Sequence, residues 1–172
     1  MATSDGIDFF ARARLVSVAV LLLVGVVSVI GGVLDWATID PCPEIVPGST
    51  FDESELDDPL CPVRGIDTTE GKVVIVAGFV ILAAAILLIL RSKASFGWLA
   101  LVSSIIAGSS AISAYRGIGD VDSSISRRFG LIDSYDPGVG LTVVAAAAVL
   151  GVIAAVVGIA ATPSSGNAAG ST

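Results

Sequence analysis

The sequence predicts an all-α integral membrane protein built as a bundle of four transmembrane helices. Hydrophobic residues make up 54% of the 172-residue chain and charged residues only 15%, against about 25% charged residues in a soluble globular domain. Four apolar segments each approach the roughly 20 residues that a helix needs to cross a bilayer. Because lipid offers backbone groups no hydrogen-bond partners, such segments are expected to fold as helices.

The predicted boundaries divide the chain into a short cytoplasmic segment, residues 1–14, and a membrane domain, residues 15–162. The predicted membrane spans are 15–34, 73–90, 94–114 and 139–161. Loops 35–72 and 115–138 are expected outside the cell, and the Gly/Ser/Ala-rich tail 163–172 is expected to be disordered. The first span exceeds the 7–15 apolar residues of a signal peptide and lacks a good cleavage site, so we expect it to be retained.

Basic residues near the ends of the spans predict the orientation of the chain in the cell membrane. Arg12 and Arg14 precede the first span, and Arg91 and Lys93 occupy the very short turn between the second and third spans. The other basic residues are spread over the two longer loops. Since short basic flanks favour the cytoplasmic side, both termini of this multi-pass protein are expected in the cytoplasm.

The two halves of the chain resemble each other, which raises the possibility of a two-plus-two internal repeat. Each half consists of a span, a loop and a glycine-led Val/Ala-rich span, and aligning Gly71 with Gly138 superposes the two glycine-led starts. Shared composition would produce the same resemblance. The sequence therefore leaves both a repeat and a chance similarity open.

The first loop contains both cysteines of the chain, Cys42 and Cys61, with 18 residues between them. A zinc site would need three or four closely spaced Cys or His ligands, and the chain contains no histidine. A redox site would need a CxxC motif or a thiol near positive charge, whereas these cysteines lie among carboxylates and prolines. We expect a disulfide, which would stabilise the fold by about 3 kcal/mol.

Carboxylates are concentrated between the two cysteines. Their spacing fails the alternating oxygen pattern of a calcium loop, although cation binding stays an alternative to a solvated acidic surface. Thr50 and Glu53 have the spacing of a capping box, which favours a short surface helix at this position. The acidic residues are Glu44, Asp52, Glu53, Glu55, Asp57 and Asp58.

The second loop has an amphipathic pattern. Val121, Ile125, Phe129 and Ile132 recur at spacings of three or four residues. Asp120 could cap the start of a helix and Gly130 its end. We expect a separate short helix here, lying at the membrane surface or over the bundle, as a cover or as a partner-binding element.

Small residues within the spans predict close helix packing, because they allow helix backbones to approach one another. The serines of the third span could alternatively line a polar path. Trp36 and Tyr115, at the outer ends of the first and third spans, are predicted to anchor the membrane interface. The predicted packing residues are Gly25, Gly31, Gly32, Ser103, Ser104 and Gly108.

Several chemistries are disfavoured by the sequence. The spans carry no ionisable residue once their ends are trimmed, which argues against a proton- or ion-coupled transporter. No nucleophile elbow, P-loop or dinucleotide motif is present, so we expect no enzyme activity, no catalytic or metal site, no cofactor and no nucleic-acid partner. We expect the protein to contact membrane lipid. We expect its function to be that of an accessory or scaffold subunit that binds other membrane proteins or its own copies. The alternatives are a small oligomeric transporter or pore, and an outside-facing sensor that binds cations.

The stretch "GGVLDWATI", Gly31 to Ile39, ends the first span with a glycine pair and a tryptophan. This pattern and the glycine-led later spans resemble small four-helix membrane proteins of actinobacteria, most of them uncharacterised. Trp36 followed by the cysteine pair is also similar to claudin-like tetraspans, although the full claudin signature is not matched. Both resemblances imply a four-helix membrane architecture, and neither implies an activity.

Overall fold

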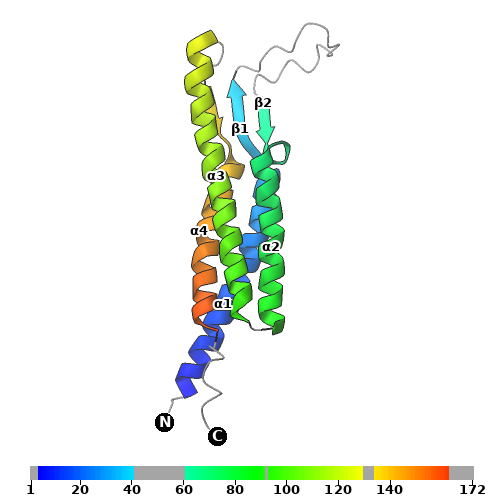
Figure 1. The fold of residues 1–172 in the computed structure, drawn as a ribbon, viewed down its shortest axis with the longest axis vertical. Helices are drawn as coiled ribbons and strands as arrows, with labels where there is room; N and C mark the ends of the chain where they lie inside the picture. The colour runs from blue at the N-terminus through cyan, green and yellow to red at the C-terminus, as the bar shows by residue number, and fades with distance from the viewer. Residues whose placement is uncertain (1–3, 41–60, 92, 130–133, 163–172) are drawn as a thin grey trace.

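The computed structural model describes residues 4–40, 61–91, 93–129 and 134–162. Its four helices run side by side along the long axis of the molecule, which confirms the predicted all-α four-helix bundle (Figure 1). The helices are α1 Ser4–Val33, α2 Thr69–Arg91, α3 Ala94–Phe129 and α4 Val139–Ala160.

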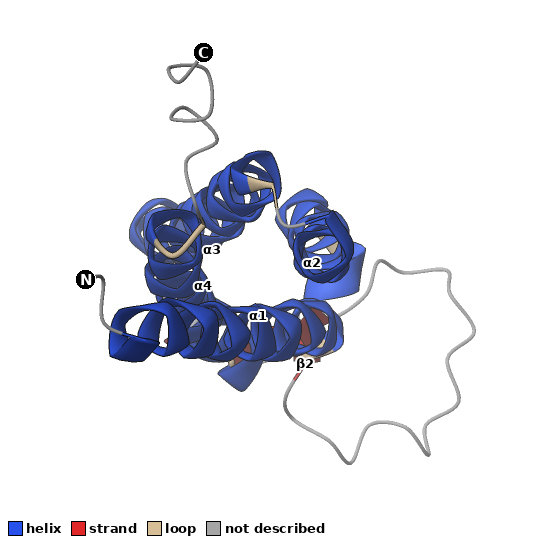
Figure 2. Ribbon diagram, turned by 90° about the horizontal axis from the view of Figure 1, so that it is seen from below, coloured by secondary structure: helices blue, strands red, loops and turns tan. Residues whose placement is uncertain are grey.

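The helices pack in the cyclic order α1, α2, α3, α4, so that each helix lies against two neighbours (Figure 2). Two clusters of buried side chains fill the interior. One is built around Leu21, Ile81 and Ala155, and the other around Val74 and Val144. Alanine and valine dominate both clusters, which suits a bundle whose helices approach closely.

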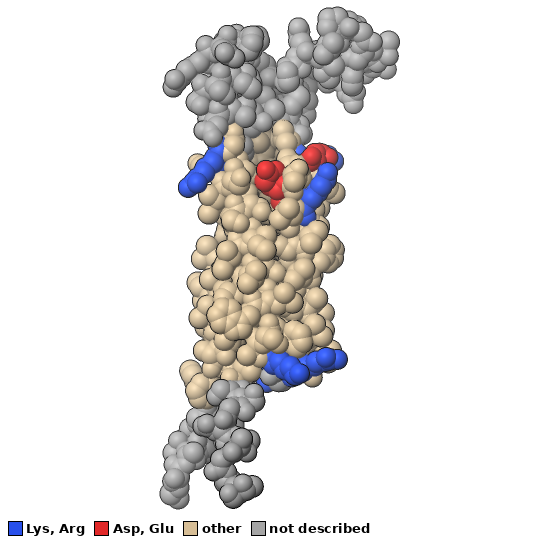
Figure 3. All heavy atoms as spheres, in the orientation of Figure 1, with Lys and Arg blue, Asp and Glu red and all other residues tan. Residues whose placement is uncertain are grey.

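Each helix contains a segment long and apolar enough to cross a membrane. Large apolar side chains such as Phe79, Trp98 and Ile105 face outward from these segments, where a soluble protein would present polar groups. On the face shown in Figure 3, charged side chains of the described residues lie near the two ends, and the part between them carries none. The segments are Phe9–Val33, Thr69–Arg91, Ala94–Gly117 and Val139–Ala160.

A three-stranded antiparallel sheet lies at one end of the bundle, and the sequence did not predict it. The strand order is β2-β1-β3, with Thr38 of β1 opposite Pro62 on one side and Asp136 on the other. The strands are β1 Asp35–Asp40, β2 Cys61–Arg64 and β3 Ser134–Pro137, and a 3₁₀ turn, η2 Gly65–Asp67, joins β2 to α2. The sheet thus links the two loops of the chain to each other.

α3 is longer than predicted. We expected the third span to end near Ala114 and a separate helix to begin near Asp120, but the structure has one continuous helix from Ala94 to Phe129. Gly117 and Gly119 lie within this helix and do not break it, since a glycine in a helix costs only about 1 kcal/mol relative to alanine. Beyond the apolar segment α3 continues past the other helices at the sheet end (Figure 1).

The start of α1, the end of α4 and the turn between α2 and α3 lie together at the end opposite the sheet (Figure 1). This arrangement follows from an even number of antiparallel helices. The basic residues Arg12, Arg14, Arg91 and Lys93 therefore belong to one end of the bundle.

Candidate functional site

The glycine pair at the end of α1 is the point where three helices meet. A Cβ atom on Gly32 would lie 3.3 Å from the carbonyl oxygen of Gly71 in α2, and one on Gly31 would lie 3.5 Å from that of Gly140 in α4. Two adjacent residues of α1 thus touch the glycine-led starts of both later helices. Gly71 and Gly140 therefore occupy equivalent positions against α1. The possible internal repeat had instead aligned Gly71 with Gly138.

The other predicted packing glycines also lie at contacts within the chain. A Cβ atom on Gly25 would lie 3.1 Å from the carbonyl oxygen of Gly78, and one on Gly108 would lie 3.2 Å from the Cβ atom of Ala148. Since these small residues face neighbouring helices of the same chain, they are used in forming the bundle. A partner protein would have to contact other surfaces.

The serines of α3 face different directions. Ser103 and Ser104 are buried, 5% and 0% exposed, and the Ser104 hydroxyl donates a hydrogen bond to the Ala100 carbonyl at 2.9 Å. Ser109 is exposed on the outside of the bundle, where its hydroxyl donates to the Ile106 carbonyl. These hydroxyls do not form one polar path through a single chain.

Trp36 is not an interface anchor, which corrects the prediction from the sequence. Its side chain is only 2% exposed, and its indole N–H donates a 2.8 Å hydrogen bond to the carbonyl of Gly31. The bond satisfies a carbonyl at the end of α1, where no intrahelical donor follows. Tyr115 is 60% exposed near the sheet end of α3, and its role at a membrane interface stays a prediction.

The predicted disulfide lies partly outside the described residues, because Cys42 falls in the undescribed part of the chain. Cys61 is the first residue of β2, and its backbone pairs with Ile39 of β1. The strand pairing therefore brings Cys61 beside a residue only three positions before Cys42 in the sequence. So short a separation along the chain is compatible with a bridge between Cys42 and Cys61. The disulfide stays a prediction.

The acidic residues of the first loop and the capping box at Thr50 also lie outside the described residues. Among the residues that the structure describes, no group of three or more His, Cys, Asp or Glu side chains could hold a metal ion. One exposed ion pair lies at the sheet end, with 3.9 Å between Arg64 Nε and Asp35 Oδ1. Exposed pairs of this kind contribute between about 0 and 1 kcal/mol.

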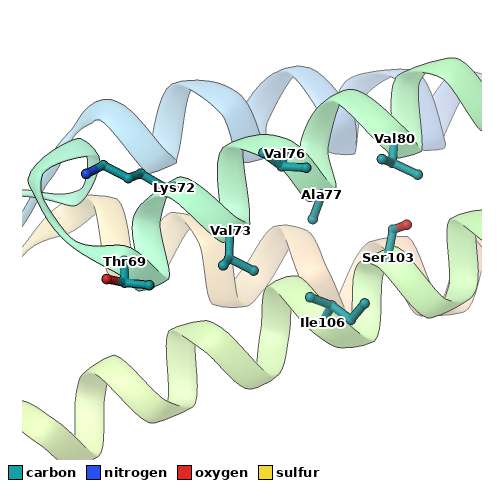
Figure 4. Close-up of a pocket in the computed structure, with 8 residues that line it drawn as sticks. All are labelled: Thr69, Lys72, Val73, Val76, Ala77, Val80, Ser103 and Ile106. Atoms are coloured by element: carbon teal, nitrogen blue, oxygen red, sulfur yellow. The ribbon is translucent and has the colours of Figure 1, made fainter.

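A groove of about 350 Å³ opens between α2 and α3, and it was not predicted from the sequence. Val73 and Ala77 point from α2 toward α3, while Ser103 and Ile106 point back from α3 (Figure 4). Lys72 lies near the start of α2 and is one of only two lysines in the chain. It is the one residue of the groove whose type could have drawn attention to this position in the sequence. The lining residues are Thr69, Lys72, Val73, Val76, Ala77, Val80, Ser103 and Ile106.

These features define a multi-pass membrane protein, with four apolar helices closed into a bundle and a small sheet at one end. No known family model matches the chain, and no curated protein or solved structure shows significant similarity to it.

Proposed function

We propose that the chain is a non-enzymatic accessory or scaffold subunit of the cell membrane, which binds a larger membrane complex or further copies of itself. The observation that carries the proposal is the extension of α3. The candidate membrane span of this helix is Ala94–Gly117, and the helix continues through residues 118–129 past the other helices (Figure 1). The helix thus continues beyond the length that a membrane crossing requires.

The sheet beside this extension adds a second surface for a partner. β1 lies in the centre, so β2 and β3 form the two edges of the sheet as the structure describes it. Edge strands carry backbone N–H and C=O groups that can pair with another chain. The helix extension and the sheet edges lie at the same end of the molecule, so one partner could contact both.

The proposed orientation places this end outside the cell and both termini in the cytoplasm. Arg12, Arg14, Arg91 and Lys93 gather at the opposite end, and short basic flanks favour the cytoplasmic side. An oxidising compartment at the sheet end would allow the Cys42–Cys61 disulfide to form. A gel shift on reduction, lost in Cys42→Ser, tests the disulfide, and labelling of an added cysteine from either side of the membrane tests the orientation.

Chemical cross-linking in native membranes tests the proposed association. The wild-type chain is expected to be captured in a larger species, and Ile125→Lys on the α3 extension should reduce this capture at least fivefold. Ile112 is 54% exposed within the apolar segment, where a lysine would place a charge in hydrocarbon. Tyr115→Phe is therefore used as the control, and it should leave capture unchanged. Recovery of the wild type only as a lone monomer would refute the proposal.

A small pore formed by several copies is a second candidate, which rests on the outward hydroxyls of α3. Ser109 and Ser113 are exposed on the outside of the bundle, where only a contact between copies could enclose them. Flux through liposomes should then fall with Ser109→Leu and persist with Ser103→Ala. The cation-sensor alternative concerns acidic residues outside the described part of the chain, and calorimetry with Ca²⁺ on the full chain tests it.

A further inference from the structure

The groove between α2 and α3 combines an apolar wall with a positive charge at one end. Val73, Val76 and Val80 of α2 and Ile106 of α3 form the apolar part. Lys72 extends along α2 toward the start of the helix, beyond this apolar part (Figure 4). The groove lies within the segments that cross the membrane, so its apolar part faces hydrocarbon and its charged end lies at the sheet-side headgroups.

We propose that this groove binds one acyl chain of an anionic phospholipid, whose phosphate contacts the Lys72 ammonium and the Thr69 hydroxyl. The site is independent of the proposed scaffold function, since it requires only that α2 and α3 cross a bilayer.

The size of the groove favours an acyl chain over a helix from another protein. A helix with its side chains is about 10–12 Å across, whereas the groove holds only about 350 Å³, near the lower limit for small-molecule pockets. Lys72 and Val80 are eight residues apart, which corresponds to about 12 Å along α2. A slender, flexible chain fits a cavity of this length and width.

The charges around the groove favour an anionic headgroup. Lys72 is exposed and forms no ion pair within the described part of the chain. Glu70 is the nearest acid in sequence, but residues two positions apart on a helix do not face each other, and Glu70 is half-buried whereas Lys72 is exposed. The positive end of the α2 dipole also lies here, with Thr68 Oγ1 accepting a 3.0 Å hydrogen bond from the Gly71 N–H.

Native mass spectrometry of the full chain from nanodiscs tests the site. The nanodiscs contain either phosphatidylcholine alone or an equal mixture of phosphatidylcholine and phosphatidylglycerol. The wild type is expected to retain one phosphatidylglycerol, and Lys72→Gln should weaken this retention about fivefold, as expected for one lysine at an anionic surface. Lys72→Arg should preserve it. Lys93→Gln removes the other lysine, at the opposite end of the bundle, and should have no effect.

A second variant tests the acyl-chain part of the site. Val80→Trp places a large side chain at the far end of the groove and should reduce the retention of both lipids, whereas Lys72→Gln should affect only phosphatidylglycerol. Equal losses in Lys72→Gln and Lys93→Gln would overturn the proposal, as would unchanged retention in Lys72→Gln. A lipid-free dimer that Val80→Trp dissociates would also overturn it, because a second copy would then occupy the groove.

Discussion

α2 packs against α1 on one side and α3 on the other, and the two contacts, here called the closed seam and the open seam, differ in the side chains that fill them. Toward α1, Gly71 and Gly78 lie against Gly32 and Gly25, and a Cβ atom added at any of these glycines would meet atoms at van der Waals contact or closer. Toward α3, the valines of α2 leave the groove that Figure 4 shows. Glycines thus mark the side on which α2 packs directly against α1, whereas valines line the side that carries the groove. The physical reason is that branched side chains hold helix backbones apart.

The largest effect is expected at Gly71, at the sheet end of the closed seam, where Gly65 of the 3₁₀ turn η2 lies against both Gly32 of α1 and Gly71 of α2. A Cβ atom on Gly71 would meet the backbone of Gly65, which cannot move aside as a side chain would. Gly71→Ala should therefore lower the free energy of unfolding by about 2–3 kcal/mol, measured by reversible unfolding in mixed detergent micelles. Gly117→Ala is the matched control, because a Cβ atom there has no neighbour within 4 Å. Equal destabilisation by the two variants would contradict the close contact between Gly71 and Gly65.

Trp36 covers the sheet end of the same seam and should give the next largest effect. Trp36→Phe keeps the aromatic ring but removes the indole N–H that donates to Gly31, which leaves a buried carbonyl without its partner. We expect a loss of about 1–2 kcal/mol in the free energy of unfolding. Trp98→Phe provides the comparison, since Trp98 is 57% exposed, and should change stability by less than about 0.5 kcal/mol. An unchanged free energy of unfolding in Trp36→Phe would show that the hydrogen bond contributes little to stability.

Ser28 offers a test with the opposite sign. It lies at the closed seam, where a Cβ atom on Gly78 would be 3.2 Å from the Ser28 Cβ atom. Its hydroxyl is buried and has no hydrogen-bond partner among the described residues. Ser28→Ala should raise the free energy of unfolding by about 1 kcal/mol, because an unpaired buried hydroxyl is costly. Ser104→Ala, which removes a hydroxyl that is paired with Ala100, should instead lower it. Destabilisation by Ser28→Ala would mean that the hydroxyl has a partner after all.

The open seam should tolerate added volume. Val80→Ile inserts one methyl group into the groove between α2 and α3 and is expected to change the free energy of unfolding by less than about 0.5 kcal/mol. Gly25→Ala adds a methyl group at the closed seam, against Leu82, and serves as the contrast in the same unfolding assay. Similar costs for the two changes would show that the seams are equally tight.

Much of the candidate site could not be predicted from the sequence. The packing role of Gly31 and Gly32 was visible because small residues at a helix end are distinctive, but their partners on two different helices were not. Trp36 was assigned to the interface because an aromatic residue at the end of a span is typical there. The pairing of β1 with strands from both loops folds this residue inward, and pairing between distant segments leaves little trace in local sequence.

The sequence by itself determined the four spans and their antiparallel order, because hydrocarbon imposes length and composition on any segment that crosses it. The tertiary structure alone decided which faces meet, that α3 continues unbroken to Phe129, and that α2 is closed toward α1 and open toward α3. The physical reason is that lipid and protein interior are equally apolar. Hydrophobicity therefore cannot tell a lipid-facing side chain from a packed one, and only the fit of neighbouring surfaces can.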